Sequence, residues 1–259
     1  MSAATEWAEA LASWAIPPEI LAMAPIDPWA FRVSERVRHT EISLTLDTPS
    51  IRRAKGQVPE GGSVLDVGCG AGAGSLPLCP PAAAVVGVDG DEEVLVAFAE
   101  QADKRGVRHS EIVGSWPGVA GEVHPADVVV CHHVVYNIQA IEAFVSALGD
   151  HARNRVVLEM TSEHPRTWMN PLWFAVHGLV RPTRPTVDDL LVVMRDLGIN
   201  AGVERWMLPL MEDEPVEEIV PHVRQALCLP AERDPEVAAA LAENPPPPAR
   251  EISTLWWDP

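Results

Sequence analysis

Long apolar runs, leader segments and positive charge are all scarce in this sequence. No uninterrupted apolar run approaches the roughly 18 residues that a membrane-spanning helix requires. The first residues, MSAATEW, lack the basic and apolar regions of a signal peptide. We therefore expect a cytoplasmic protein that does not enter a membrane.

The deficit of positive charge and the sparse cysteines exclude further classes of function. Lys and Arg number 19 against 37 Asp and Glu, which gives a formal net charge of −18. Such a field repels nucleic acid and anionic lipid. Cys69, Cys79, Cys131 and Cys228 form no C-x-x-C pair, so the sequence indicates neither a metal site nor a disulfide framework. They are typical of reduced, mostly buried thiols.

What the chain does contain is a regular alternation of strands and helices. Its 259 residues, 47% of them hydrophobic, suffice for one α/β domain with additions. Short β-branched runs alternate with helical segments, which predicts a parallel sheet covered on both faces. The predicted strands are residues 63–67, 84–89, 111–113, 126–131 and 155–160, with helices over 91–102 and 138–148. Ligands bind such sheets at the carboxyl ends of the strands.

Helical segments flank this alternation on both sides. Residues 1–57 are predicted to form a helical extension or cap, and residues 58–259 the main domain. Within the main domain, 161–180 is a cover segment and 212–248 a helical insertion before the last strand. The other predicted helices are 6–15, Asp27-Pro28 through Val37, Pro49 through Ala54, 173–179, 186–197 with Thr186 and Asp189 as a capping box, 213–227 and 235–243. Strands are expected over 202–208 and 251–257, where Trp256 and Trp257 point to opposite faces.

The segment 63–72, SVLDVGCGAG, predicts a strand, a turn and a ligand site. A P-loop would need Lys and then Ser or Thr after the second glycine, and neither is present. A dinucleotide fingerprint is formally matched by Gly68, Gly70 and Ala73. Asp66 would repel a pyrophosphate but suits a cationic amine. Asp89 follows about 20 positions later at the end of the second strand, where an acidic residue binds ribose hydroxyls. An amine and a ribose together favour S-adenosylmethionine over NAD.

These residues resemble the class I S-adenosylmethionine-dependent methyltransferases. Residues 64–72 are similar to the first motif of that family, 86–89 to the second and 127–131 to the fourth. The resemblance implies a Rossmann-like, seven-stranded, mostly parallel sheet with an antiparallel C-terminal strand. It also implies that S-adenosylmethionine is the cofactor. The cofactor contacts that it implies are Asp66, Gly68, Cys69, Gly70, Asp89, Gly90, Ser115, Trp116, Cys131 and His132. Trp116 either stacks on the adenine or packs in the core.

His133 and Tyr136 follow the fourth strand and are the candidate catalytic residues. Either one acts as a base or substrate contact, or both shape the pocket wall. The chain lacks the Asn/Asp-Pro-Pro-aromatic signature of adenine-N6 enzymes after the fourth strand, and no Pro-Cys nucleophile follows. We therefore expect a small-molecule acceptor, apolar or aromatic, beneath the Trp-rich segments 1–57 and 161–180, and no nucleic-acid partner. A homodimer is the assembly that we consider. An inactive cofactor-binding protein and an NAD-dependent oxidoreductase remain the alternatives.

Overall fold

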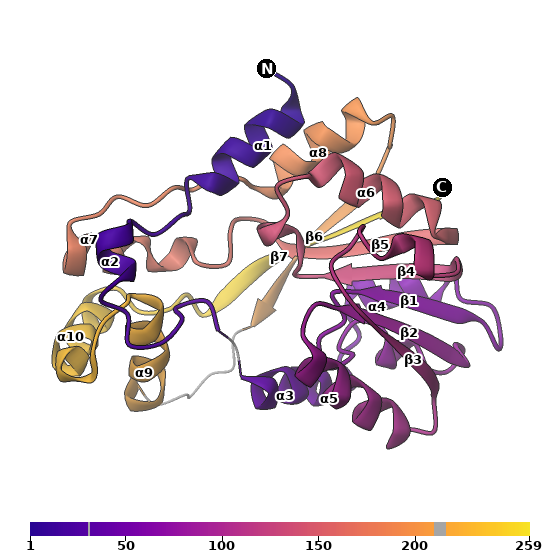
Figure 1. The fold of residues 1–259 in the computed structure, drawn as a ribbon, viewed down its shortest axis with the longest axis horizontal. Helices are drawn as coiled ribbons and strands as arrows, with labels where there is room; N and C mark the ends of the chain where they lie inside the picture. The colour runs from indigo at the N-terminus through magenta and orange to yellow at the C-terminus, as the bar shows by residue number, and fades with distance from the viewer. Residues whose placement is uncertain (31, 210–215) are drawn as a thin grey trace.

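The computed structural model describes residues 1–30, 32–209 and 216–259, the last segment without the side chains of 216–218. Its centre is a seven-stranded sheet with the order β3-β2-β1-β4-β5-β7-β6 (Figure 1). β7 runs antiparallel to both of its neighbours, whereas the first five strands pair in parallel. The predicted fold class is therefore confirmed. The strands are β1 (Ser63–Val67), β2 (Ala84–Asp89), β3 (Arg108–Val113), β4 (Ala126–His132), β5 (Ala152–Thr161), β6 (Gly202–Pro209) and β7 (Ala249–Trp257).

Helices cover both faces of this sheet. On one face, α1, α6 and α8 contribute Trp7, Phe144 and Leu190 to a fully buried cluster. On the other face, α4 and α5 contribute Ile51 and Phe98 to a second cluster. The helices are α1 (Ala3–Ala12), α2 (Pro18–Leu21), α3 (Val33–Ser43), α4 (Pro49–Lys55), α5 (Glu92–Asp103), α6 (Ile141–Asp150), α7 (Asn170–His177), α8 (Val187–Asp196), α9 (Val216–Ala226) and α10 (Asp234–Glu243). None of the helices among the described residues is long and apolar enough to cross a membrane.

The two tryptophans near the C-terminus show how the sheet separates the two clusters. Trp257 belongs to the cluster under α6 and α8, whereas Trp256 packs against the cluster under α4 and α5. Successive side chains of a strand point to opposite faces, so the predicted orientation of this pair is confirmed. The Arg53 guanidinium lies over the Trp256 ring, 3.9 Å from its centroid.

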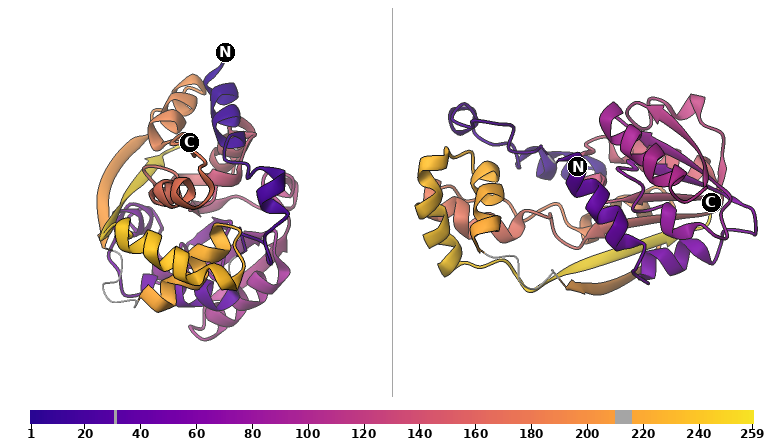
Figure 2. Two further views of the ribbon diagram at one scale, coloured as in Figure 1. Left: turned by 90° about the vertical axis from the view of Figure 1, so that its left-hand side faces the viewer. Right: turned by 90° about the horizontal axis from the view of Figure 1, so that it is seen from below.

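A third cluster forms a separate helical lobe from α2, α7, α9 and α10 (Figure 1; Figure 2). Its centre contains Leu172, Trp173, Leu227 and Leu241, which are almost completely buried. β5 leads into this lobe through α7, and β7 begins directly after α10. The lobe therefore lies beyond the carboxyl ends of the parallel strands, where ligands of such sheets bind.

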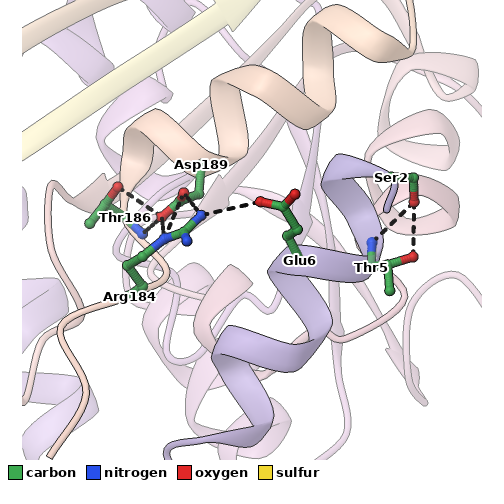
Figure 3. Close-up of polar contacts among 6 residues, drawn as sticks. All are labelled: Ser2, Thr5, Glu6, Arg184, Thr186 and Asp189. Atoms are coloured by element: carbon green, nitrogen blue, oxygen red, sulfur yellow. Dashed lines mark hydrogen bonds and ion pairs between the residues drawn. The ribbon is translucent and has the colours of Figure 1, made fainter.

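The N-terminal helix is fixed to the start of α8 (Figure 3). Arg184 Nη2 donates to Asp189 Oδ1 at 2.6 Å and lies 3.6 Å from Glu6 Oε2 on α1. Asp189 also accepts from the Thr186 amide at 2.7 Å, so the predicted capping box is present. Trp7 anchors the helix from inside, because its Nε1 donates to the Ile138 carbonyl at 2.8 Å.

Several predicted boundaries are wrong. No helix begins at Asp27-Pro28; the Asp27 carboxylate accepts from the Trp29 amide at 2.9 Å in a local turn, and α3 begins only at Val33. The third strand starts at Arg108 because it pairs with β2 along its whole length. The helix expected from residue 138 begins at Ile141, after a 3-10 turn. The expected starts at 212 and 213 lie outside the described residues.

Candidate functional site

The glycine loop after β1 uses its glycines for different purposes. Gly68, Gly70 and Gly72 all have φ in the left-handed region, at 71°, 53° and 96°. A Cβ on Gly68 would lie 2.3 Å from Val134 Cγ2, so this glycine lets the segment after β4 approach. A Cβ on Gly70 would meet nothing closer than Arg36 Nη1, at 3.7 Å. The loop is therefore open to a ligand at Gly70 rather than at Gly68.

Asp89 at the end of β2 holds this loop. Its Oδ2 accepts from the Gly70 amide at 3.0 Å, and its Oδ1 accepts from the Asp91 amide at 3.2 Å. A carboxylate has about four acceptor sites, so roughly two remain for further donors. A Cβ on Gly90 would meet nothing within 4 Å, which leaves space beside the carboxylate. Hydroxyl groups of a bound ligand therefore have acceptors available here.

Asp66 lies beneath the loop, in β1, and is only 1% exposed. Its Oδ2 accepts from the Ser75 hydroxyl at 2.6 Å. Burial raises the pKa of Asp66 to about 7, against the opposing effect of the Ser75 hydrogen bond, and the charge of Asp89 adds to the rise. A cation bound next to Asp66 would favour its ionised form.

The other predicted cofactor contacts differ in what they expose. Cys69 and Cys131 turn their thiols into the two core clusters, and burial raises their pKa well above the ordinary value. Only their backbone is left to face a ligand. Ser115 is exposed after β3. Trp116 is buried and meets the His151 ring edge-on, with 4.8 Å between centroids, which favours packing over adenine stacking.

His132 ends β4 close to Asp66. A Cβ on Gly74 would lie 3.2 Å from His132 Nδ1 and 3.4 Å from Asp66 Oδ1, so both side chains border the same point. His132 Nε2 is buried and has no hydrogen-bond partner among the described residues. Burial lowers the pKa of His132 more than the negative charge of Glu159 raises it.

His133 is exposed and held in an unusual conformation. Its φ is 59°, a region that costs a non-glycine residue on the order of 1–3 kcal/mol. Its amide donates to the Glu159 carbonyl at 2.8 Å, and its Nε2 lies 3.1 Å from Glu159 Oε1. Glu159 is 9% exposed; burial alone would raise its pKa, but His132 and His133 outweigh burial and lower it to about 2. Glu159 therefore stays charged and orients the His133 imidazole.

Tyr136 is held differently. Its hydroxyl lies 2.7 Å from Thr161 Oγ1 and also accepts from the Thr161 amide. Burial raises the pKa of Tyr136 well above its ordinary value. These contacts argue against Tyr136 as a base at neutral pH and favour it as part of the wall.

Two cavities adjoin this region. One, of about 440 Å³, is lined by Trp14 and Trp29 from the N-terminal segment and by Tyr136 and Asn137 after β4. The second, of about 320 Å³, lies between the end of β5 and the start of β7 and is lined by Thr167 and Arg250, among others. His164 lines both, so the cavities are neighbours.

Two contributors were missed by the sequence analysis. Glu159 is the first, because only the pairing of β4 with β5 places it directly opposite His132. The second is His39 on α3, which lies near His133. Burial lowers the pKa of His39, and the charge of His133 adds to this effect. The local sequence does not predict where α3 lies, because its position depends on packing against α5.

Comparisons with known proteins bear on the fold. Residues 64–154 match the family model described as "Methyltransferase domain". The chain is similar to the YcgJ protein of Bacillus subtilis, at 16% identity and a TM-score of 0.54, over 84% of this chain and 98% of that one. It is similar to the magnesium protoporphyrin IX methyltransferase of Synechocystis with bound SAH, at 19% identity and a TM-score of 0.52, over 87% of each chain. No curated protein matches the sequence. Residues 64–154 thus match a methyltransferase domain, and the chain as a whole has the Rossmann-like fold of these two solved structures.

Proposed function

We propose that the chain binds S-adenosylmethionine at the glycine loop and transfers its methyl group to a small-molecule acceptor. The observation that carries this proposal is the pair of carboxylates around the open loop. Asp66 is buried beneath it, and Asp89 fixes the Gly70 amide while keeping free acceptor sites. One carboxylate suits a cationic amine and the other suits ribose hydroxyls.

The residues present fit this cofactor. Gly70 and Gly90 leave open space beside Asp89, and His132 Nε2 is a buried polar atom without a partner among the described residues. Asp66 and His132 would then hold the amino-acid end, and Asp89 the ribose. When bound, the sulfonium supplies an electrophilic methyl group, so the chain must supply mainly position.

His133 is the candidate base on this proposal. Its imidazole is exposed beside the carboxyl end of β4, and Glu159 fixes its orientation from below. A base in this position takes the proton from a hydroxyl or ammonium acceptor, which contributes about 10²- to 10⁴-fold to a rate. The cavity between Trp14 and Trp29 is the candidate acceptor site.

An NAD-dependent oxidoreductase is the weaker alternative. The carboxyl of Asp66 beneath the loop disfavours a pyrophosphate, although Gly68, Gly70 and Ala73 formally match the dinucleotide fingerprint. A cofactor-binding protein without turnover is the other alternative, which only an activity measurement separates from an enzyme.

Thermal unfolding with S-adenosylhomocysteine or NAD tests the cofactor. At a hundredfold excess over its Kd, a ligand stabilises the folded state by about 2.7 kcal/mol. In a chain of this size, that corresponds to a rise in Tm of about 5–10 °C. We expect this rise with S-adenosylhomocysteine, its loss in Asp89→Ala, and none with NAD. Stabilisation by NAD alone would refute the proposal. Transfer of labelled methyl from S-adenosylmethionine to a panel of aromatic acceptors then separates an enzyme from an inactive binder.

A further inference from the structure

Three partly or fully buried arginines lie around the two cavities without carboxylate partners. Arg166 Nη2 donates to the Pro28 carbonyl at 2.6 Å, and its guanidinium lies 3.9 Å from the centroid of the Trp29 ring. Arg181 donates to the carbonyls of Ala15 and Trp14. Neither forms an ion pair within the described part of the chain. This is unusual in a protein with 37 acidic residues, where carboxylate partners are plentiful.

Arg250 is the clearest of the three arginines without a carboxylate partner. Its guanidinium has neither a hydrogen bond nor an ion pair with any described residue, and its Nε is buried. It lines the cavity of about 320 Å³ next to Thr167, whose buried hydroxyl likewise has no partner among the described residues. Two carboxylates, Glu163 and Glu251, also line this cavity, but both are exposed and neither pairs with Arg250; Glu251 Oε2 lies 4.0 Å from Arg205 Nε. A partly buried guanidinium without a protein partner has lost part of its hydration, so it favours an anionic partner that comes from outside.

The adjoining cavity offers the opposite chemistry. Trp14 stacks on His164 with 3.7 Å between ring centroids, and Tyr136 meets the same imidazole edge-on at 5.7 Å. Burial, together with the charges of Arg166 and Arg181, lowers the pKa of His164 to about 3, so its ring is neutral. His164 therefore lines both an aromatic cavity and the cavity that contains Arg250.

We propose that the two cavities bind one acceptor molecule, with its aromatic body between Trp14 and Trp29 and a carboxylate on Arg250. This inference rests on the proposed function, because it names the acceptor class of the same site. A guanidinium binds a carboxylate through two parallel hydrogen bonds, which gives both affinity and orientation. The carboxylate is thus a handle that positions the rest of the acceptor.

Calorimetric titration of the full chain with 2-naphthoate and with the uncharged 2-naphthamide tests this directly. A charged hydrogen-bonded pair is worth about 10- to 100-fold in affinity, so we expect the wild type to prefer the carboxylate by that factor. Arg250→Gln should abolish the preference and leave the affinity for the amide unchanged. Arg250→Lys should retain part of it, and the matched surface variant Arg195→Gln should retain all of it.

Equal binding of the two probes to the wild type, or binding of neither, would overturn the inference. So would a preference that survives Arg250→Gln. S-adenosylhomocysteine binding is measured on the same preparations to separate the two proposals. If it binds while the naphthoate preference is absent, only the acceptor class is wrong. If the preference is present and S-adenosylhomocysteine does not bind, the anion site stands and the methyltransferase function does not.

Discussion

Replacing Asp66 by Asn should stabilise the unliganded protein at high pH while weakening cofactor binding. Asp66 is 1% exposed, and its pKa rises from 3.8 to about 7 on folding. The unfolded chain therefore loses this proton at lower pH than the folded chain does. Between pH 3.8 and about 7 the folded state binds more protons, so stability falls as pH rises and then levels off. The total change is about 4 kcal/mol at about 1.4 kcal/mol per pH unit.

Urea denaturation of wild type and Asp66→Asn between pH 5 and 9 measures this effect. The variant should gain about 1.6 kcal/mol over wild type at pH 5 and about 4 kcal/mol above pH 8. Its Asn oxygen still accepts from the Ser75 hydroxyl, so that contact is kept. Asp91→Asn is the matched control, because the Asp91 carboxylate is exposed and Asn also caps a helix. A stability difference that does not change with pH would refute the reasoning.

The same variant should bind S-adenosylhomocysteine about 10- to 100-fold more weakly, since a charged hydrogen bond is lost. Binding to the wild type at pH 7 should also release up to about half a proton, because Asp66, with a pKa of about 7, is half protonated in the free protein and a ligand cation favours its ionised form. Calorimetry in two buffers of different ionisation enthalpy detects that release. No release, together with undiminished affinity in Asp66→Asn, would mean that the ligand cation does not meet this carboxylate.

Three further predictions concern other parts of the structure. His133→Ala should lower kcat by about 10²- to 10⁴-fold, and Glu159→Gln should lower it by less. S-adenosylhomocysteine affinity should be unchanged in both variants. A rise in KM with kcat unchanged would contradict a role for His133 as a base. Gly68→Ala should lose about 2–5 kcal/mol of stability in urea denaturation, from its φ of 71° and the 2.3 Å approach to Val134, and Val134→Ala should recover part of it. Trp7→Ala should cost about 3–5 kcal/mol in the same assay, because Trp7 is 1% exposed; a loss below 1 kcal/mol would mean that α1 is not part of the core.

Much of the sheet could be predicted because strands carry local signals. β-branched runs mark β2 and β4, and each ends on a polar residue at the edge where ligands bind. The contact between Asp89 and Gly70 follows from this edge, since β1 and β2 are parallel neighbours. The capping box of α8 was equally visible.

The rest depends on contacts between distant residues. Glu159 orients His133 only because β5 pairs with β4 in one register. The helical lobe joins segments around Leu172 and Leu227 with a short N-terminal helix, and no local pattern pairs them. The Asp27-Pro28 prediction failed because an Asp side chain can cap a turn as readily as a helix.

A crystal structure of the full chain with S-adenosylhomocysteine tests the central claim most directly. We expect the ribose hydroxyls within hydrogen-bond distance of Asp89, the ligand against the open face of Gly70, and the amino-acid end beside Asp66. A ligand bound elsewhere, or a glycine loop that stays empty at saturating ligand, would contradict the proposed function.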